Sequence, residues 1–401
     1  MWFSLMKYNF NLFFKSFYKS FFKAKGTHAH LTRKRLGFLF LFYFVWPVWG
    51  IVIWFTLFLD NLFFKNFKDQ AVDKPLFITG NFRSGSTFLQ RLIAKDKDHF
   101  LSARTWDIFL SPTITLTSIF SVINFLDRKI GSPIKRIFRN FDQRTLGQVD
   151  IHHISFFEPE EDENFLLHNW SSYFGGILFP FIEDYKQYLY FDHQIKEEKR
   201  AEIMQFYHGL IQRFLYARGG KRRLLSKNPS ISPKIASIYE AFPTARIVYL
   251  VRNPLEMLPS TISWLGYVWR VFSDPNETYP FTQEILEFCK HWYQYPLSIL
   301  EKTDPNKYLI IKYNDLVHEP QRTIKHIYSH FGYTMSPQFE EQILASAMEA
   351  EKFRSKHEYV LDEMGISRKE VLKEFSDIFD RFGFDRNVKG VSPIGKESTL
   401  D

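Results

Sequence analysis

The sequence predicts an α/β domain in which a mostly parallel sheet is flanked by helices. Four short apolar segments have the length and composition of buried strands, each is followed by a helical stretch, and a loop with two glycines follows the first. This alternation is typical of parallel sheets, which carry their binding loops at the carboxyl ends of the strands. The strands are expected at residues 75–79, 223–226, 246–251 and 308–312.

The chain length and composition define the broad class. The 401 residues are enough for one large domain or two ordinary ones. No repeat or low-complexity tract interrupts residues 75–385, so we interpret them as one domain, followed by a tail over residues 386–401. Apolar residues make up 45% of the chain and charged residues 24%, which excludes a disordered or fibrous protein. The single cysteine, Cys289, excludes an intramolecular disulfide and favours a reducing compartment.

Positive charge is concentrated at the amino terminus. Residues 1–35 contain eight Lys or Arg and no acid, whereas residues 36–401 hold 44 bases and 44 acids. The formal charge of +8 therefore belongs to the first 35 positions. Nucleic-acid binding needs a basic groove on the folded domain, so we expect no nucleic-acid partner.

Residues 1–35 also interleave lysine with aromatic residues. Lys7, Lys15, Lys19 and Lys23 follow a spacing of four, with Asn11 in the remaining position, and six phenylalanines lie between them, at positions 10, 13, 14, 17, 21 and 22. This pattern is typical of an amphipathic helix in the headgroup region of a bilayer, where lysine stems reach the phosphates and aromatic rings dip inward.

A hydrophobic segment follows at residues 36–59. Its 24 positions hold no charged side chain, which is enough for one crossing of the roughly 30 Å hydrocarbon layer and too few for two. A buried helix of a soluble domain is the alternative. We expect Pro47 and Gly50 to break the helix and return the chain to the same face, with the following domain facing the cytoplasm. The cations before the segment favour instead a lumenal, type II arrangement. A charged linker at residues 60–74 leads into the domain.

The loop after the first strand has the features of an anion site. Gly80 and Gly85 allow backbone NH groups to approach an anion, and the following helix directs its positive end at the same point. The loop resembles a phosphate-binding P-loop, but Ser86 stands where that pattern requires lysine, which argues against ATP hydrolysis. Arg83 offers a planar fork that can bind two oxygens of a phosphate or sulfate. A plain tight turn is the alternative.

A second anion loop follows the strand at residues 246–251. Arg252 comes directly after the strand, Pro254 is suited to open a helix, and Ser260 lies eight residues after Arg252. Arg252 and Ser260 can thus bind one more phosphate. Each residue alone also fits a strand end or a helix surface, but two anion loops at strand ends favour a ligand with two anionic groups.

These two loops resemble those of the sulfotransferase superfamily, whose members use 3'-phosphoadenosine-5'-phosphosulfate (PAPS). The segment Arg83-Ser84-Gly85-Ser86-Thr87 matches the family form, in which Lys or Arg is followed by Ser or Thr, Gly and two more Ser or Thr, and which binds the 5'-phosphosulfate. The family holds the 3'-phosphate with an Arg and a Ser spaced as Arg252 and Ser260 are. The resemblance covers residues 75–384, is greatest to the bacterial and membrane-linked branch, and implies a P-loop-like sulfotransferase fold with PAPS as co-substrate and no metal.

The resemblance also implies catalytic roles. Lys227, at the end of the strand at residues 223–226, would stabilise the leaving phosphate. Asp107 is the first choice of general base, because related tyrosylprotein and membrane-type enzymes place a carboxylate after the loop helix. His152 and His153 are the second choice, since imidazole titrates near the useful pH range. The alternative for Asp107 is a helix cap. The alternative for Lys227, His152 and His153 is a place on the polar or charged surface.

Two further features have more than one interpretation. We interpret residues 158–163, which contain five acids and one proline, mainly as the start of a helix, with contact to a substrate or arginine as the alternative. The nucleotide-closing element of cytosolic members is absent, and Asn228 stands where their catalytic histidine would be. Arg354 or Lys356 is a candidate for the missing cation, with an exposed basic turn as the alternative.

The patterns together predict an enzyme that moves a sulfuryl group from PAPS to a hydroxyl of a lipid, sterol or carbohydrate acceptor at a membrane. The acceptor class is inferred from the amino-terminal segment alone. A P-loop nucleotide kinase or hydrolase and a non-catalytic membrane scaffold are the alternatives.

Overall fold

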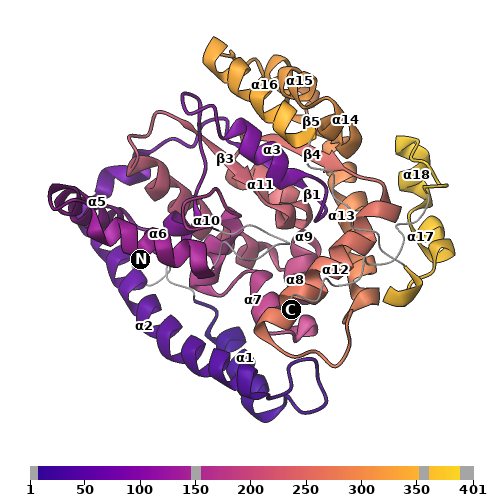
Figure 1. Ribbon diagram of the computed structural model, residues 1–401, viewed down its shortest axis with the longest axis horizontal. Coiled ribbons are helices and arrows are strands. Elements are labelled where there is room, and N and C mark those ends of the chain that lie inside the picture. The colour runs from indigo at the N-terminus through magenta and orange to yellow at the C-terminus, as the bar shows by residue number, and fades with distance from the viewer. Residues whose placement is uncertain (1–7, 146–154, 352–360, 389–401) are drawn as a thin grey trace, which may run out of the picture.

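The fold is centred on a five-stranded sheet, seen in a computed structural model that describes residues 8–145, 155–351 and 361–388 (Figure 1). All strand pairs are parallel and the strand order is β2-β3-β1-β4-β5. The α/β class with a mostly parallel sheet is therefore confirmed. The strands are β1 (Leu76–Gly80), β2 (Phe100–Leu101), β3 (Arg223–Lys227), β4 (Arg246–Val251) and β5 (Tyr308–Lys312).

Helices cover both faces of this sheet. Alternate strand residues point to opposite faces, so Ile78 belongs to one hydrophobic core and Phe77 to the other. The first face is covered by α3 (Ser86–Ile93), α14 (Tyr313–His318), α15 (Pro320–Phe331) and α16 (Pro337–Glu351). The helices on and around the second face are α7 (Phe174–Leu178), α8 (Ile182–Leu189), α9 (Phe191–Gln194), α10 (Glu197–Tyr216), α11 (Ile235–Ala241), α12 (Pro254–Phe272), α13 (Thr282–Leu300), α17 (Arg368–Glu374) and α18 (Ser376–Phe382).

The remaining elements connect these layers. Two longer helices form a hairpin after the short helix α4, and the other connecting elements are single 3₁₀ segments. These elements are α4 (Thr105–Phe109), α5 (Ile114–Lys129), α6 (Pro133–Thr145), η2 (Lys65–Asp69), η3 (Asp162–Asn169), η4 (Pro229–Lys234), η5 (Pro305–Lys307) and η6 (Asp362–Met364).

The amino-terminal helices are α1 (Phe10–Phe22) and α2 (Arg33–Phe63). Helix α2 runs through Pro47 and Gly50, so the expected break at these residues is wrong. Proline removes one intrahelical hydrogen bond, but the buried Leu39 and Ile53 hold the helix against the domain on both sides of it. Of the described helices, α2 alone is long and apolar enough to cross a membrane by length and composition.

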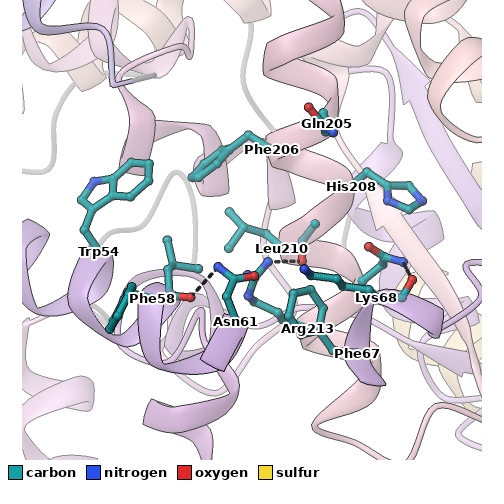
Figure 2. A pocket seen from close by; sticks show the side chains of 13 residues that line it. Trp54, Phe58, Asn61, Phe67, Lys68, Gln205, Phe206, His208, Leu210 and Arg213 are labelled. Carbon is teal, nitrogen blue, oxygen red and sulfur yellow. Dashed lines mark hydrogen bonds between the residues drawn. The ribbon is translucent and has the colours of Figure 1, made fainter. Parts of the chain in front are cut away.

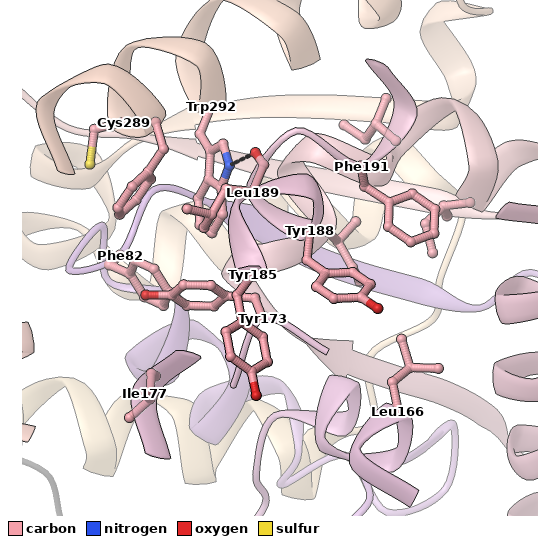
Figure 3. Close-up of a cluster of buried hydrophobic side chains, with 14 of the residues drawn as sticks. Phe82, Leu166, Tyr173, Ile177, Tyr185, Tyr188, Leu189, Phe191, Cys289 and Trp292 are labelled. Carbon is pink, nitrogen blue, oxygen red and sulfur yellow. Dashed lines mark hydrogen bonds between the residues drawn. The ribbon is translucent and has the colours of Figure 1, made fainter. Parts of the chain in front are cut away.

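Aromatic side chains fill the core around Phe82, which belongs to the loop between β1 and α3 (Figure 3). The Phe82 ring lies 5.2 Å from that of Trp292 and 6.1 Å from that of Tyr173, measured between centroids. Cys289 is buried beside this cluster, and burial raises the pKa of its thiol well above the usual value. The cysteine is therefore a packing residue and not a reactive thiol.

Candidate active site

The loop between β1 and α3 depends on its two glycines. Gly80 has a φ of +146°, and a Cβ there would lie 2.3 Å from the carbonyl oxygen of Leu250. Gly85 has a φ of +88°, and a Cβ there would lie 2.9 Å from the Tyr313 ring. Both positions exclude a side chain, and Gly85 is the N-cap of α3, so the positive end of the helix points to the loop.

The two predicted anion loops are in direct contact. Arg83 Nε donates a hydrogen bond to Ser260 Oγ at 3.1 Å, and Arg252 Nη1 donates to the Arg83 carbonyl oxygen at 2.8 Å. The register of the sheet explains this contact, because β1 and β4 are neighbours and end side by side, with Gly80 paired to Leu250. The arginines that the sequence places 169 residues apart therefore lie in one site.

A cavity of about 620 Å³ contains both arginines. This volume is in the range of small-molecule and cofactor sites. The Arg252 guanidinium lies 4.1 Å from the centre of the Tyr313 ring, which fixes its plane. Ser84 is fully buried beside the cavity lining, and its Oγ has no hydrogen-bond partner among the described residues. The predicted residues that line the cavity are Arg83, Gly85, Ser86, Thr87 and Arg252.

Glu161 also lines this cavity and is paired with Lys227. The distance between Glu161 Oε1 and Lys227 Nζ is 2.8 Å, and both side chains are buried. Glu161 Oε2 is buried and accepts no hydrogen bond from the described residues. Burial raises the pKa of Glu161 to about 7, against the opposing effect of the Lys227 charge. A carboxylate with a free oxygen and such a pKa can accept a proton at neutral pH.

The next two acids hold η3 against the sheet. Asp162 accepts hydrogen bonds from Ser226 Oγ and Tyr207 Oη, both at 2.8 Å, and Glu163 pairs with Lys234 at 2.6 Å. The acidic segment does open a helix, as expected. However, its carboxylates bind groups on β3, η4 and α10, which the sequence alone did not indicate.

Asp107 has a different environment from Glu161. Its carboxylate accepts from Arg104 Nε at 2.8 Å and Nη2 at 3.0 Å, and from Arg218 Nη2 at 2.5 Å. Burial acts to raise the pKa of Asp107, but the Arg104 hydrogen bonds and the Arg218 charge hold it below its usual value. Asp107 is not among the residues that line the cavity of Arg83 and Arg252. It is also part of a capping box at the start of α4.

Four other candidates lie outside the described residues. They are His152, His153, Arg354 and Lys356. The sequence analysis did not single out Glu161 or Tyr313, although Glu161 lies in the acidic segment at residues 158–163 and Tyr313 directly follows the strand at residues 308–312. Neither segment has a spacing that shows which side chain faces the ligand.

A second cavity, of about 500 Å³, lies between α2 and α10 (Figure 2). It is mostly apolar, with Trp54 and Phe58 of α2 facing Phe206 of α10. Its lining shares no residue with that of the first cavity. The two cavities are therefore separate sites of the protein.

Comparison with known proteins agrees with this geometry. A family model described as "Sulfotransferase family" matches residues 75–337. The omega-hydroxy-beta-dihydromenaquinone-9 sulfotransferases Stf3 of Mycobacterium bovis and Mycobacterium tuberculosis are each 24% identical over 327 residues, covering 79% of this chain and 76% of theirs.

Two solved structures have a similar fold. Sulfotransferase STF9 from Mycobacterium avium superposes with a TM-score of 0.66 at 16% identity, covering 82% of both chains. Sulfotransferase STF1 from Mycobacterium tuberculosis superposes with a TM-score of 0.60 at 19% identity, covering 80% of this chain and 81% of that one. Since the family model spans more than half of the chain and the predicted anion loops meet in one cavity, the protein belongs to the sulfotransferase family.

Proposed function

We propose that this sulfotransferase moves a sulfuryl group from PAPS to a hydroxyl group of a lipid acceptor at a membrane surface. The observation that carries the proposal is the contact between the two anion loops, in which Arg252 donates to the Arg83 carbonyl and Arg83 donates to Ser260. A single cavity with two guanidinium groups suits a ligand that carries two anionic groups on one nucleotide.

The chain offers groups for both ends of the donor. Arg83, the backbone NH groups of the loop, and the hydroxyls of Ser84, Ser86 and Thr87 would hold the 5'-phosphosulfate, as the family resemblance implies. Arg252 and Ser260 would hold the 3'-phosphate. The Ser260 hydroxyl accepts from Arg83, which leaves its own proton to donate to a phosphate oxygen. We propose that these cations take the place of a metal ion.

The reaction needs an acceptor, a base and a stabilised leaving group. The acceptor oxygen forms a bond to sulfur, the bond from sulfur to the 5'-phosphate oxygen breaks, and that oxygen keeps the electron pair. Lys227, buried at the end of β3, would stabilise the charge that develops on the leaving phosphate. The hydroxyl proton leaves to a carboxylate of the protein.

We propose Glu161 as that carboxylate, in place of Asp107. Glu161 lines the cavity, and its Oε2 accepts no hydrogen bond from the described residues, whereas the carboxylate of Asp107 accepts hydrogen bonds from two arginines. Asp107 would then act as a structural anion that fixes α4. His152 and His153 keep their place as alternatives to Glu161.

The acceptor class is proposed from two observations. The relatives that share 24% identity are named for a hydroxylated menaquinone derivative, which is a lipid. In this chain the exposed side of α2 is apolar. A lipid or sterol acceptor is therefore favoured over a carbohydrate. We propose a cytoplasm-facing location, and the lumenal arrangement stays the alternative.

The test is a labelling experiment on the purified full-length protein. PAPS labelled in its sulfuryl group is incubated with the protein and either a lipid extract or a water-soluble glycan mixture. We expect label in the lipid fraction, and label in the glycans alone would overturn the acceptor class. In parallel, adenosine 3',5'-bisphosphate should raise the melting temperature. No change in melting temperature at saturating nucleotide would overturn the donor site.

A further inference from the structure

We propose that the outer sides of α1, α2 and the α5–α6 hairpin form one docking surface, which lies flat in a single leaflet of an anionic bilayer. We call this surface the apolar face. It consists of the exposed apolar residues of these four helices and of Ile130 between the last two. The helices lie along the left and lower edges of the molecule in Figure 1, and α2 contacts α5.

Exposed apolar side chains are concentrated on this face. Of the thirty large apolar side chains that are exposed in the described residues, twenty-five belong to it, which is more than a water-facing surface normally gathers in one place. The other five are Leu31, Phe157, Val271, Val317 and Leu344. The exposed residues of α1 and α2 are Phe10, Phe14, Phe17, Tyr18, Phe22, Leu36, Phe40, Leu41, Phe44, Val45, Val48, Ile51, Phe55, Phe58, Leu62 and Phe63.

Helix α2 lies along the domain and does not leave it. The exposed stripe from residue 40 to residue 63 is about 35 Å long, at 1.5 Å per residue. The opposite side of the helix is buried in the domain core at both ends of this stripe, through Leu39 and Leu57. A helix that crosses the bilayer upright would have to carry the packed domain into the hydrocarbon with it.

Asp60 makes such a crossing still less favourable. Its buried carboxylate accepts from the backbone NH groups of Ile114 and Thr115, at 2.9 and 2.8 Å, and pairs with Arg213 Nε at 3.2 Å. These contacts fix the end of α2 to the start of α5 and to α10. Since a buried ion pair and its domain cannot be placed in lipid without a large cost, α2 is inferred to lie parallel to the membrane plane.

The α5–α6 hairpin presents apolar residues in the same way. Asp127 closes it by accepting from the backbone NH groups of Ile134 and Lys135, at 2.8 and 3.1 Å. On α6 the inner Phe138 packs against Trp106, with ring centroids 5.1 Å apart. The outer side of the hairpin exposes Ile119, Val122, Ile123, Phe125, Leu126, Ile134, Ile137 and Phe141.

The charges around the apolar face favour anionic lipid as the occupant. In residues 8–63 and 114–142 the three acids, Asp60, Asp127 and Asp142, are all buried. The charged side chains that are exposed there are all cations, namely Lys15, Lys23, Lys25, Arg33, Lys34, Arg128, Lys129, Arg136 and Arg139. Lys15 and Lys34 are paired with Asp184 and Asp274 of neighbouring elements, and the other seven cations leave an excess of positive charge around the apolar face. This excess matches a leaflet with negative headgroups.

Vesicle flotation tests the surface. The full-length protein should float with vesicles of phosphatidylcholine and phosphatidylglycerol, and less with phosphatidylcholine alone. Val48→Glu on α2 and Ile137→Glu on α6 should each lower the bound fraction by roughly tenfold, because a charge must then enter the leaflet. Leu344→Glu, on α16 at the opposite side of the molecule, is the matched control and should bind as the unchanged protein does.

Several outcomes would overturn the proposal. One is that the unchanged protein fails to float with the vesicles, and another is that Leu344→Glu loses as much binding as the two face variants. A third is that the unchanged protein is a soluble dimer that does not bind vesicles and that Val48→Glu and Ile137→Glu dissociate.

Membrane topology gives a second test, in which tags at the amino and carboxyl termini should be cleaved from the same side of sealed vesicles. Cleavage from opposite sides would show a crossing. Melting temperatures of all variants, measured without vesicles, exclude misfolding. Because these tests measure binding and topology, they are independent of sulfuryl transfer.

Discussion

Glu161, which lines the cavity of Arg83 and Arg252, forms an ion pair of 2.8 Å with Lys227, although the two residues are 66 positions apart in the chain. Lys227 ends β3, and Glu161 immediately precedes η3. In the proposed reaction, this pair places the proton acceptor next to the cation that stabilises the leaving phosphate. Its geometry is the basis of the first prediction.

Glu161→Gln should lower kcat by roughly 100-fold or more, because general base catalysis contributes about this much. Adenosine 3',5'-bisphosphate should still raise the melting temperature. In the unchanged protein kcat/KM should rise with pH through about 7, since below this pH burial keeps the Glu161 carboxyl protonated. The glutamine variant should lose this step in its pH profile. If the pH profile of kcat/KM were the same in the variant, another residue would be the base, and His152 and His153 would be the next candidates.

Arg83 and Ser260 should separate chemistry from nucleotide binding. Arg83→Ala should lower kcat by about 100- to 1000-fold, because it removes charge stabilisation at the transferred group. Ser260→Ala should raise KM for PAPS by roughly tenfold with little change in kcat. The Ser260 hydroxyl is assigned to the 3'-phosphate, which takes no part in the transfer. Steady-state kinetics measures both. The exposed Ser329→Ala is the control and should leave both constants unchanged. Full turnover in both site variants would refute the assignment of the cavity.

Asp107→Asn should act on stability. Removing the buried carboxylate leaves the mostly buried Arg218 without its anion, which costs about 3 to 5 kcal/mol for a broken buried pair, whereas the half-exposed Arg104 adds little. The melting temperature measures this loss. At a permissive temperature kcat should stay near that of the unchanged protein, and a collapse of kcat without a change in melting temperature would restore Asp107 as the base.

The same variant gives a pH test. The pKa of Asp107 is lower in the folded protein than its usual value, so its contribution to stability is present above about pH 4 and is lost as the pH falls through the folded value. The difference in melting temperature between the unchanged protein and the variant should therefore be full at pH 6 and should shrink below about pH 4. A difference that grows on acidification would contradict the assigned contacts.

Gly85→Ala should weaken nucleotide binding by more than the backbone strain at a left-handed φ accounts for. That strain costs about 1 to 2 kcal/mol for a residue with a side chain. In addition, the new Cβ would lie 2.9 Å from the ring of Tyr313, which stacks with Arg252. Gly365→Ala is the control, because it has a φ of +73° and open space around it. Calorimetric titration with adenosine 3',5'-bisphosphate should show weaker binding for Gly85→Ala alone. Equal affinities would mean that Tyr313 does not position Arg252.

The sequence predicted the sheet well because buried parallel strands are continuous apolar runs. The four expected strands agree with β1, β3, β4 and β5 to within one residue at each end. The two-residue β2 was missed, since it is too short to leave a pattern. The expected break at Pro47 was wrong because packing of α2 against the domain overrides the local preference of proline.

The meeting of the loops that carry Arg83 and Arg252 was predictable from the sequence, and the position of the proposed base was less so. Arg83, Arg252 and Ser260 follow strands at fixed spacings, so a one-dimensional pattern identifies them. Glu161 faces the cavity because residues 156–160 pair through backbone hydrogen bonds with residues 103–106, a contact that no local spacing records. Asp107 has the expected position after the loop helix, but one of the two arginines that donate to its carboxylate, Arg218, comes from just after α10, more than a hundred residues away.

The α5–α6 hairpin also supports the segment that carries Glu161. Asp142 of α6 accepts from Ser155 Oγ at 2.7 Å and from the Phe156 backbone NH at 3.0 Å, and the Phe156 ring lies 5.1 Å from that of Phe138. Deleting the α5–α6 hairpin, residues 114–145, would remove the contacts that hold this segment together with part of the proposed apolar face. Such a variant is therefore expected to lose turnover as well as vesicle binding.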